Sequence, residues 1–384
     1  MSFTIHEVQT RKDLGRFIKF PFKVYKKNKY WVPPLLMDEW NTLEAKKNPA
    51  FQHCRVKYFL AEKDGQLVGR IAGIINDRYV EKWGNKCCRF GWFDFIDDKS
   101  VSKALLEAVE QWAIDNGMTA VHGPLGFTDM DREGMLIEGF EELGTMATQY
   151  NHPYYPEHMR ELGYGKDVDW VEFEVHVPEE ILERALRLQN LVLKRSKLRI
   201  VEAKKKALIP YGKKMFELIN EAYSDLYGFV ALTDEQIDVY IKQYFGFIHP
   251  DYVKFITDEN DALIAFGIAM PSLSRALQRS RGRLLPFGFI HLLWALKLPK
   301  YIDFLLVAVR PDYQARGITA ILMTEMTRNC LKNKIISAET NVELETNTQV
   351  QAIWKHYDAR QHKRRRCYIK NLSQSSRLGA PMAT

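Results

Sequence analysis

The chain has 384 residues, of which 46% are hydrophobic and 12% aromatic, so it can fill packed interiors and is not a disordered chain. That length exceeds what one ordinary hydrophobic core serves, and we expect two domains. The formal net charge of +7 is modest, and no DNA- or RNA-binding motif accompanies it. We therefore expect no nucleic-acid partner.

The five cysteines are odd in number and form no Cys-x-x-Cys pair. They indicate a reducing compartment and argue against a zinc site, so we expect no metal. The N-terminal segment is rich in Lys and Arg and lacks an apolar core of signal-peptide length, which predicts no export signal. A cytoplasmic protein is expected. Association with a membrane surface stays open but is not favoured.

The first half predicts strands and helices in close alternation. Asp64 and Gly65 mark a tight turn, so the flanking segments 57–62 and 66–76 predict a β-hairpin. Before the hairpin we expect a strand over residues 3–8 and a helix over 11–29 that the prolines at 33 and 34 end. After it we expect a strand over 89–96, an amphipathic helix over 99–116, a strand over 118–123, a short helix ending near 162 and a strand over 170–177.

Two further segments of the first half bear on ligand binding. The helix over 99–116 begins next to Asp97 and Asp98, and two carboxylates at a helix start disfavour an anion there, while Asp98 or Ser100 would cap the helix. The glycine-rich, acidic segment 126–144 predicts an ordered loop. It either faces a cleft of the second half or forms a solvated excursion on the surface.

A helix over residues 178–196 is expected to join the halves, and the pattern of the first half then restarts. Thr233 and Gln236 fit a capping box, which marks the start of a helix over 233–245. The other elements expected in this stretch are a strand over 198–203, a helix over 209–227 and strands over 252–258 and 262–271.

Residues 272–300 form an insertion whose first part is basic and whose second part is apolar and aromatic. One interpretation is a lid or wall of an apolar pocket. Another is an interfacial helix attracted to anionic lipid. A third is a helix pair that buries its aromatic side chains against the first domain.

The segment 302–320 is the most informative part of the chain. A buried strand is expected over 302–309 and a helix over 317–333. Between them Gly317 lets the backbone approach a ligand, and the first helical N–H groups lack intrahelical partners, which predicts an anion site. The remaining expectations are a strand over 335–345, a helix that starts at 346–348, a strand over 367–370 and a disordered tail over 373–384.

The run V-x-V-x-P-x-Y-Q-x-x-G-x-T resembles the acyl-coenzyme-A signature of the GNAT acetyltransferase superfamily, with Gln314, Gly317 and Thr319 in the phosphate-binding places. Thr319 departs from the usual Gly or Ala. The resemblance implies an α/β (α+β) protein of two GNAT-like domains, each a mixed, mostly antiparallel central sheet flanked by helices. The implied division is a degenerate domain over 1–177, a linker helix over 178–196 and an acyl-CoA-binding domain over 197–372.

The resemblance also implies roles for individual residues. A backbone N–H near Val309 would polarise the thioester carbonyl, and Asp303 would act as the base, on the same strand face as Val309 because their offset of six is even. Glu339 and Glu343 are further candidates for the base. Tyr357 is the candidate proton donor to the thiolate, since Trp354 stands where the family has its tyrosine. The implied cofactor-binding residues are Val307, Val309, Gln314, Ala315, Arg316, Gly317, Ile318, Thr319, Ala320 and Asn347.

The function that this resemblance implies is N-acetyl transfer from acetyl-CoA to an amine acceptor that the sequence does not identify. One alternative is aminoacyl or longer-chain acyl transfer, as in the Fem-type peptidyltransferases and N-myristoyltransferase, which also use doubled domains. Another is a non-catalytic coenzyme-A sensor or scaffold.

Overall fold

A computed structural model describes residues 3–202, 205–246, 248–314 and 316–372. The strands are β1 (Phe3–Glu7), β2 (Cys54–Lys63), β3 (Gln66–Asn76), β4 (Cys87–Phe95), β5 (Ala120–Gly123), β6 (Met135–Glu138), β7 (Gly165–His176), β8 (Arg199–Glu202), β9 (Val253–Thr257), β10 (Leu263–Pro271), β11 (Tyr301–Val309), β12 (Ser337–Glu339), β13 (Glu343–Leu344) and β14 (Ala359–Asn371). The predicted tail over 373–384 lies outside the described residues.

The α-helices are α1 (Arg11–Lys19), α2 (Pro21–Val24), α3 (Leu36–Leu43), α4 (Asp77–Trp83), α5 (Lys99–Asp115), α6 (Tyr154–Glu161), α7 (Glu183–Arg195), α8 (Lys205–Ala222), α9 (Asp234–Tyr244), α10 (Ser274–Ser280), α11 (Gly288–Lys297), α12 (Ile318–Lys332) and α13 (Thr348–Trp354). Among the described residues, no helix has both the length and the apolar character needed to cross a bilayer.

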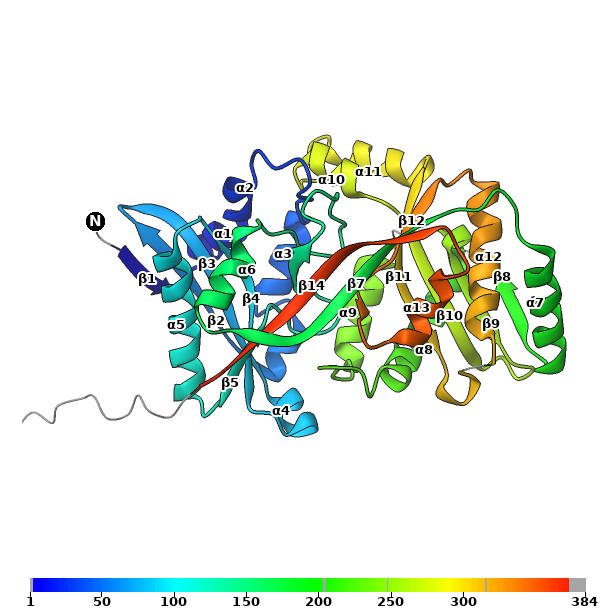
Figure 1. Ribbon diagram of the computed structural model, residues 1–384, viewed down its shortest axis with the longest axis horizontal. Helices are drawn as coiled ribbons and strands as arrows, with labels where there is room; N and C mark the ends of the chain where they lie inside the picture. Colours follow the sequence, from blue (N-terminus) through cyan, green and yellow to red (C-terminus); the bar gives the residue numbers. More distant parts are fainter. Residues whose placement is uncertain (1–2, 203–204, 247, 315, 373–384) are drawn as a thin grey trace, which may run out of the picture.

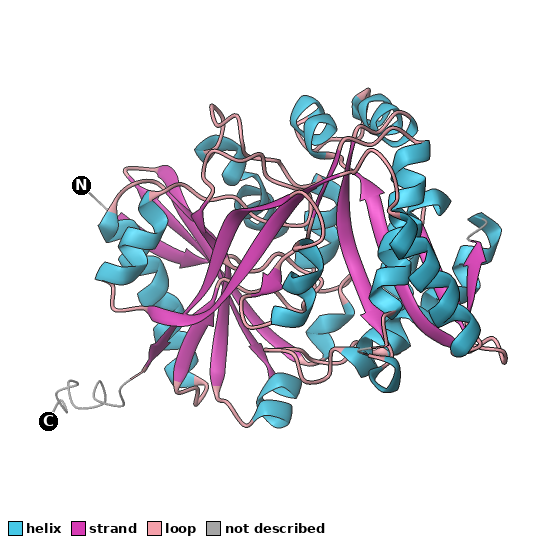
Figure 2. Cartoon of the chain, turned by 45° about the vertical axis from the view of Figure 1, so that its right-hand side comes forward, coloured by secondary structure: helices cyan, strands magenta, loops and turns pink. Residues whose placement is uncertain are grey.

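One twisted sheet runs through the whole molecule, with helices on its faces (Figures 1 and 2). Its order is β1-β2-β3-β4-β5-β14-β7-β12-β11-β10-β9-β8, with β6 beside β14 and β13 beside β7. Each half repeats one unit: an antiparallel meander whose last strand pairs in parallel with the strand after a long helix. The parallel pairs are β4 with β5 and β11 with β12. The predicted mixed, mostly antiparallel α/β fold is therefore confirmed.

The two halves exchange their last strands. β7 belongs to the first half by sequence but pairs with β12, and β14 belongs to the second half but pairs with β5. β7 and β14 also pair with each other along most of their length and cross the middle of the molecule in Figure 1. The halves consequently share backbone hydrogen bonds, so neither sheet is complete without the other half.

Helices cover both faces of the second half of the sheet. α8 and α9 pack on one face, where Ile219 and Ile237 share a buried cluster with Phe266. α12 packs on the other face through Ile318 and Leu322, against residues of β9 and β10 and the end of β11, and α7 lies over α12. The start of α12 is thereby fixed beside the end of β11.

Several predicted boundaries were wrong, each for a local reason. The helix over 11–29 breaks after Phe20, because Pro21 has no N–H to donate and starts α2 instead. The joining helix begins at Glu183, five residues later than expected. The strand over 335–345 divides into β12 and β13, and the closing strand is β14 over Ala359–Asn371 rather than 367–370.

Candidate active site

The edge of β11 opens where its parallel neighbour turns away. β11 pairs with β12 at three positions, the last of which joins Asp303 to Glu339. Beyond it the chain bends at Thr340, because Thr340 exchanges hydrogen bonds with Phe173 of β7 through its backbone N–H (2.9 Å) and its hydroxyl (3.0 Å). β13 then pairs with β7 and leaves the rest of the β11 edge without a strand partner.

Backbone groups of Val307 and Val309 point to this opened edge. Opposed residues of an antiparallel pair alternate between hydrogen-bonded and non-bonded positions. Arg310 N–H donates to Ile264 O at 2.9 Å, so Arg310 is at a hydrogen-bonded position, and by alternation so is Ala308. Val307 and Val309 are at non-bonded positions, and their backbone groups therefore point away from β10. Two side chains agree with this direction: Tyr223 donates to the Val307 carbonyl (2.7 Å), and Gln314 donates to the Val309 carbonyl (3.2 Å).

A β-bulge in β11 reverses the predicted placement of Asp303. In the register with β10, Ile268 opposes Leu306 and Ala269 opposes Phe304, so Leu305 is an extra residue. Because one extra residue changes the face of every following side chain, Asp303 and Val309 lie on opposite faces. The expectation of a shared face is wrong.

The start of α12 has the form expected of an anion site. Gly317 is the N-cap with φ of 79°, a conformation that favours glycine, and no side chain in the described part of the chain caps the helix. The first N–H groups of α12 are therefore available to a ligand. Arg316 is exposed beside them and stacks on the ring of Tyr313 at 4.9 Å.

A cavity of about 2080 Å³ connects the opened β11 edge, the start of α12 and the first half of the chain. Of the predicted site residues, those that line it are Val307, Val309, Gln314, Gly317, Ile318, Thr319, Ala320, Asn347 and Tyr357. Arg316 and Asp303 are outside the lining, and Ala315 falls outside the described residues. The walls are mostly apolar and include Leu188 of α7, Leu306 of β11 and Met323 of α12.

Two carboxylates from the first half face the same cavity. Asp129 and Glu133 both line it, and they belong to the acidic segment 126–144, so its placement toward the cleft is confirmed. Burial raises the pKa of Asp129 to about 6 and holds the pKa of Glu133 well above its usual range, and the charge of Asp129 adds to the latter. The sequence showed the acidic loop but gave no means of ranking these two side chains.

Tyr223 connects Asp129 with the β11 edge. Asp129, Tyr223 and Val307 all line the cavity, and the Tyr223 hydroxyl is bonded to Val307 O. The carboxylate, the phenol and the opened strand edge are thus parts of one site, assembled from both halves.

Glu343, Trp354 and Tyr357 form the opposite wall. Trp354 donates its indole N–H to the carboxylate of Glu343 (2.9 Å), so its side chain is already engaged. Burial raises the pKa of Glu343 to about 7 and also raises the pKa of Tyr357, whose hydroxyl bonds to Thr327. Tyr357 lines the cavity and packs edge-on against Trp354.

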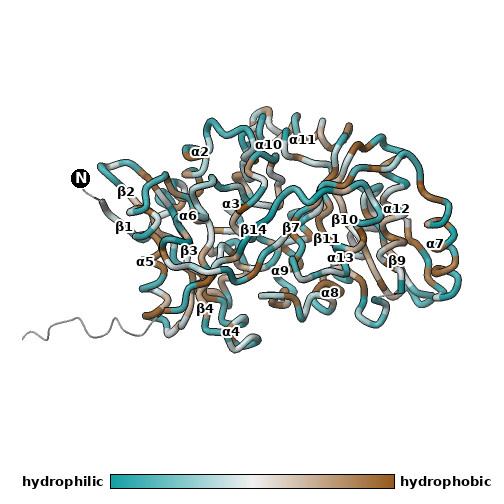
Figure 3. The backbone as a smooth tube through the Cα atoms, viewed as in Figure 1, coloured by the Kyte–Doolittle hydropathy of each residue, from teal (hydrophilic) through white to brown (hydrophobic). Residues whose placement is uncertain are grey.

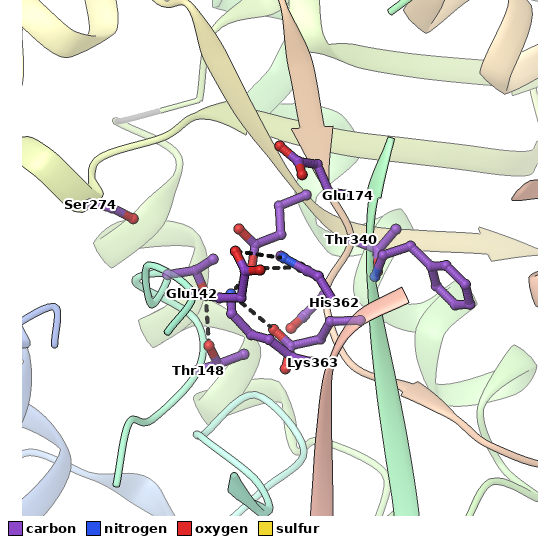
Figure 4. A network of polar contacts seen from close by, with 12 residues as sticks. Glu142, Thr148, Glu174, Ser274, Thr340, His362 and Lys363 are labelled. Carbon is purple, nitrogen blue, oxygen red and sulfur yellow. Dashed lines mark hydrogen bonds and ion pairs between the residues drawn. The ribbon is translucent and has the colours of Figure 1, made fainter. Parts of the chain in front are cut away.

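The buried carboxyl of Asp303 interacts electrostatically with Glu339 and Lys363. Lys363 is part of the polar network that Figure 4 shows. Lys363 of β14 is paired with Glu339 and lies 3.8 Å from Glu172. His362, which Figure 4 shows beside it, contacts Glu142 at 3.7 Å. The network joins β7, β12 and β14, so its charges hold the exchanged strands together.

The corresponding corner of the first half is filled. Tyr155 accepts the backbone N–H of Phe95, the last residue of β4, and Tyr154 donates to the Phe95 carbonyl (2.6 Å). Asp98 caps α5 by accepting from Ser100 N–H, as predicted, and its pairing with Lys63 holds its pKa at about 2. A negative charge therefore stands where the second half has its open helix start.

Three potential metal ligands, His122, Asp167 and Cys367, lie within 4.8 Å of one another near the junction of the halves. The hydroxyl of Tyr227 bonds to Asp167 and lies 3.2 Å from His122 Nδ1 and 3.5 Å from Cys367 Sγ. Burial raises the pKa of the Cys367 thiol well above its usual range. A protonated thiol bridged by a phenol fits a hydrogen-bonded junction better than a thiolate metal site.

The chain is similar in sequence to two known bacterial proteins. The chain is 31% identical over 369 residues to Protein YghO of Escherichia coli (strain K12), covering 94% of each chain. It is 30% identical over 297 residues to Bacterial ceramide synthase of Caulobacter vibrioides (strain NA1000 / CB15N), covering 76% of each chain. No family model matches the chain.

Solved structures are similar in fold at low identity. A tandem GNAT protein from the clavulanic acid biosynthesis pathway has a TM-score of 0.58 at 10% identity, covering 97% of this chain and 100% of its own. A GCN5-related N-acetyltransferase from Sphaerobacter thermophilus has a TM-score of 0.51 at 11% identity, covering 96% of both chains.

Proposed function

The chain belongs to the family of Protein YghO and Bacterial ceramide synthase and has a tandem GNAT fold, and from that premise we propose that it is a coenzyme-A-dependent N-acyltransferase. The opened edge of β11 beside the start of α12 carries this proposal. Backbone donors at Val307 and Val309 lie where a pantetheine and a thioester carbonyl can accept hydrogen bonds, and the helix start with Gly317 suits a diphosphate.

Carboxylates on the first-half side of the cavity supply the base. An amine attacks a thioester carbonyl only after it has lost a proton; burial raises the pKa of Asp129 to about 6, and burial together with the charge of Asp129 raises the pKa of Glu133 well above its usual range. They line the cavity, whereas Asp303 and Glu339 do not. We therefore assign the base to the Asp129 and Glu133 pair in place of Asp303.

The bond changes follow from this arrangement. The amine nitrogen forms a bond to the thioester carbonyl carbon while the Asp129 and Glu133 pair takes the ammonium proton. The carbon–sulfur bond breaks as Tyr357 on the opposite wall gives a proton to the departing sulfur, and the second proton that the nitrogen loses passes through water to restore Tyr357. The N–H groups of Val307 and Val309 stabilise the negative charge that develops on the carbonyl oxygen.

The acyl group is longer than the acetyl group expected from the sequence. The cavity of about 2080 Å³ exceeds the roughly 300–1,000 Å³ of ordinary small-molecule pockets, and its walls are mostly apolar. A ceramide is the amide of a fatty acid and a long-chain amino alcohol, and Bacterial ceramide synthase is a relative at 30% identity. Both observations favour a long-chain acyl-CoA as donor and a long-chain amine as acceptor.

A donor and acceptor matrix tests the proposal. Acetyl-, octanoyl- and palmitoyl-CoA are each offered with a short amine and with a long-chain amino alcohol, and amide product is measured by mass spectrometry. We expect the highest kcat/KM with palmitoyl-CoA and the long-chain amine. A preference for acetyl-CoA would show that the reaction is N-acetylation instead. A higher melting temperature of the protein with coenzyme A, without any amide product, would favour a coenzyme-A sensor.

A further inference from the structure

The insertion of the second half carries an exposed apolar surface that the proposed reaction does not use. None of the described residues in 272–300 lines the cavity, so the interpretation of this segment as a pocket wall is wrong. The third interpretation is also wrong for the aromatic side chains, because Phe287 and Trp294 are 71% and 68% exposed.

The helix pair itself is firmly packed. Leu277 of α10 and Leu292 of α11 are buried with Val32 and Leu35 of the first half. Gln278 donates to the carbonyls of Lys29 and Trp31, and Gly282 O accepts from Leu36 N–H. The two helices therefore present their outer side in a fixed orientation at the upper edge of the molecule, as Figures 1 and 3 show.

The exposed side chains follow one side of α11 and the segment before it. Positions 289, 290, 293 and 294 of α11 and 298 after it recur at helical spacing and face outward, while Leu292 faces the protein. We define the α11 surface by its exposed apolar residues: Leu285, Phe287, Phe289, Ile290, Leu293, Trp294, Leu298 and Tyr301. A soluble monomer seldom leaves so concentrated an apolar surface without a partner.

The charged residues of the insertion all have one sign. No Asp or Glu occurs between Asp261 and Asp303. All the basic side chains of the insertion are exposed, and none forms an ion pair within the described chain; they are Arg275, Arg279, Arg281, Arg283, Lys297 and Lys300. Lys29 lies next to α10 and adds to this rim.

The positive charge of the insertion favours some partners of the α11 surface over others. A second copy of the chain would bring one basic rim against another, which like charges oppose. Anionic headgroups complement the rim, and exposed Trp, Phe and Leu side chains beside Lys and Arg are typical of interfacial membrane helices. We propose that the α11 surface binds the surface of a lipid bilayer that contains anionic phospholipids.

The position of the surface relates it to the cavity. Leu296 of α11 and Leu305 of β11 pack on the same buried cluster, and Leu305 also lines the cavity. The buried cluster beneath α11 therefore also borders the cavity. An enzyme held in this way would meet long-chain substrates at the membrane where they dissolve.

Vesicle flotation of the full chain without any acyl-CoA tests the proposal independently of catalysis. Vesicles are made of phosphatidylcholine alone or of phosphatidylcholine and phosphatidylglycerol in equal amounts. We expect the protein to float with the mixed vesicles, to float at least tenfold less with phosphatidylcholine alone, and to be released by high salt, because each basic side chain contributes about fivefold to binding.

Paired variants locate the contact. Phe287→Ser combined with Trp294→Ser removes apolar contact, and Arg279→Glu combined with Arg283→Glu reverses two charges; each pair is expected to lower bound protein at least tenfold. The matched controls are Leu191→Ser on α7, which is 61% exposed, and Lys332→Glu with Lys334→Glu at the end of α12, and they should float like the wild type. Unchanged melting temperatures verify that all variants are folded.

Failure of the wild type to float with mixed vesicles would overturn the proposal. So would binding that survives the loss of Phe287 and Trp294. If light scattering shows a dimer that those two substitutions abolish, the α11 surface is instead an interface between copies of the chain.

Discussion

The backbone N–H of Phe95 donates to the hydroxyl of Tyr155 over 3.0 Å at the end of β4. Phe95 ends β4 as Val309 ends β11: both strands have nine residues, and each precedes a helix that leads to a parallel neighbour. Tyr155 thus occupies the end of β4 in the first half, whereas the corresponding end of β11 in the second half is open. We therefore expect one site in a fold that is present twice.

This difference predicts a single coenzyme A per chain. The first half offers a filled strand edge and the carboxylate of Asp98, and the second half offers free N–H groups. Isothermal titration calorimetry with coenzyme A should give one equivalent, and Asp98→Ala should change neither the stoichiometry nor the affinity. Two equivalents in the wild type would show that the first half also binds.

Loss of either cavity carboxylate should slow acyl transfer. Asp129→Asn and Glu133→Gln are each expected to lower kcat/KM by about 10²-fold or more, the range for loss of a general base. In the wild type the rate should fall as the pH drops through about 6, since protonated Asp129 cannot accept a proton, and this acidic limb should vanish from the residual activity of Asp129→Asn.

Asp97→Asn is the control for that pair, because the Asp97 side chain is 67% exposed and contacts His158 in the filled corner of the first half. It should leave the rate and its pH profile unchanged. Full activity in both cavity variants would move the base elsewhere.

Tyr357 is expected to act on the chemical step and not on donor binding. Tyr357→Phe should lower kcat by about 10²-fold with coenzyme-A affinity unchanged, because the substitution removes the proton for the departing sulfur and keeps the ring. Tyr301→Phe, at the exposed start of β11, serves as the control. A Tyr357→Phe enzyme with wild-type kcat would leave protonation of the sulfur to water.

Asp303 should affect stability rather than catalysis. Burial, with the charge of Glu339 adding to it, raises the Asp303 pKa from 3.8 to about 7, so the folded state binds a proton that the unfolded state releases. The free energy of unfolding should therefore fall as the pH rises from about 4 to 7, and a shift of this size corresponds to about 4 kcal/mol.

Asp303→Asn tests this dependence. The variant should be more stable than the wild type at pH 8 and should lose most of the decline between pH 4 and 7, as measured by urea denaturation. Asp64→Asn, in the exposed turn between β2 and β3, should retain the decline. An Asp303→Asn protein with the wild-type pH dependence would contradict the assignment.

Local signals predicted much of the fold correctly. The Asp64-Gly65 turn gave the β2–β3 hairpin, the Thr233 capping box gave the start of α9, and the strand, glycine and helix around Gly317 gave the proposed phosphate site. These features depend on neighbouring residues, which a sequence displays directly.

Features that depend on distant partners were missed. β14 carries charged residues on both faces, so its sequence lacks the alternation of apolar and polar residues that is typical of a strand. Residues of β7 pair with these charges: Glu172 pairs with Arg365, and Asp169 pairs with Arg366. Figure 3 shows the hydrophilic course of β14 through the middle of the molecule. The bulge at Leu305, which moved Asp303 to the other face, is visible only in the pairing with β10. The role that we propose for Asp129 and Glu133 depends on a cavity that both halves line.

Calorimetric titration of coenzyme A into two Gly317 variants tests the central claim most directly. Gly317→Ala keeps the helix start free of charge, and among the described residues its Cβ meets only Val192, at 3.7 Å. It should therefore bind within about fivefold of the wild type despite about 1–2 kcal/mol of backbone strain. Gly317→Glu places a carboxylate against the diphosphate and should weaken binding at least 100-fold. Equal affinity in the two variants would contradict the claim that the start of α12 holds the diphosphate of the acyl donor.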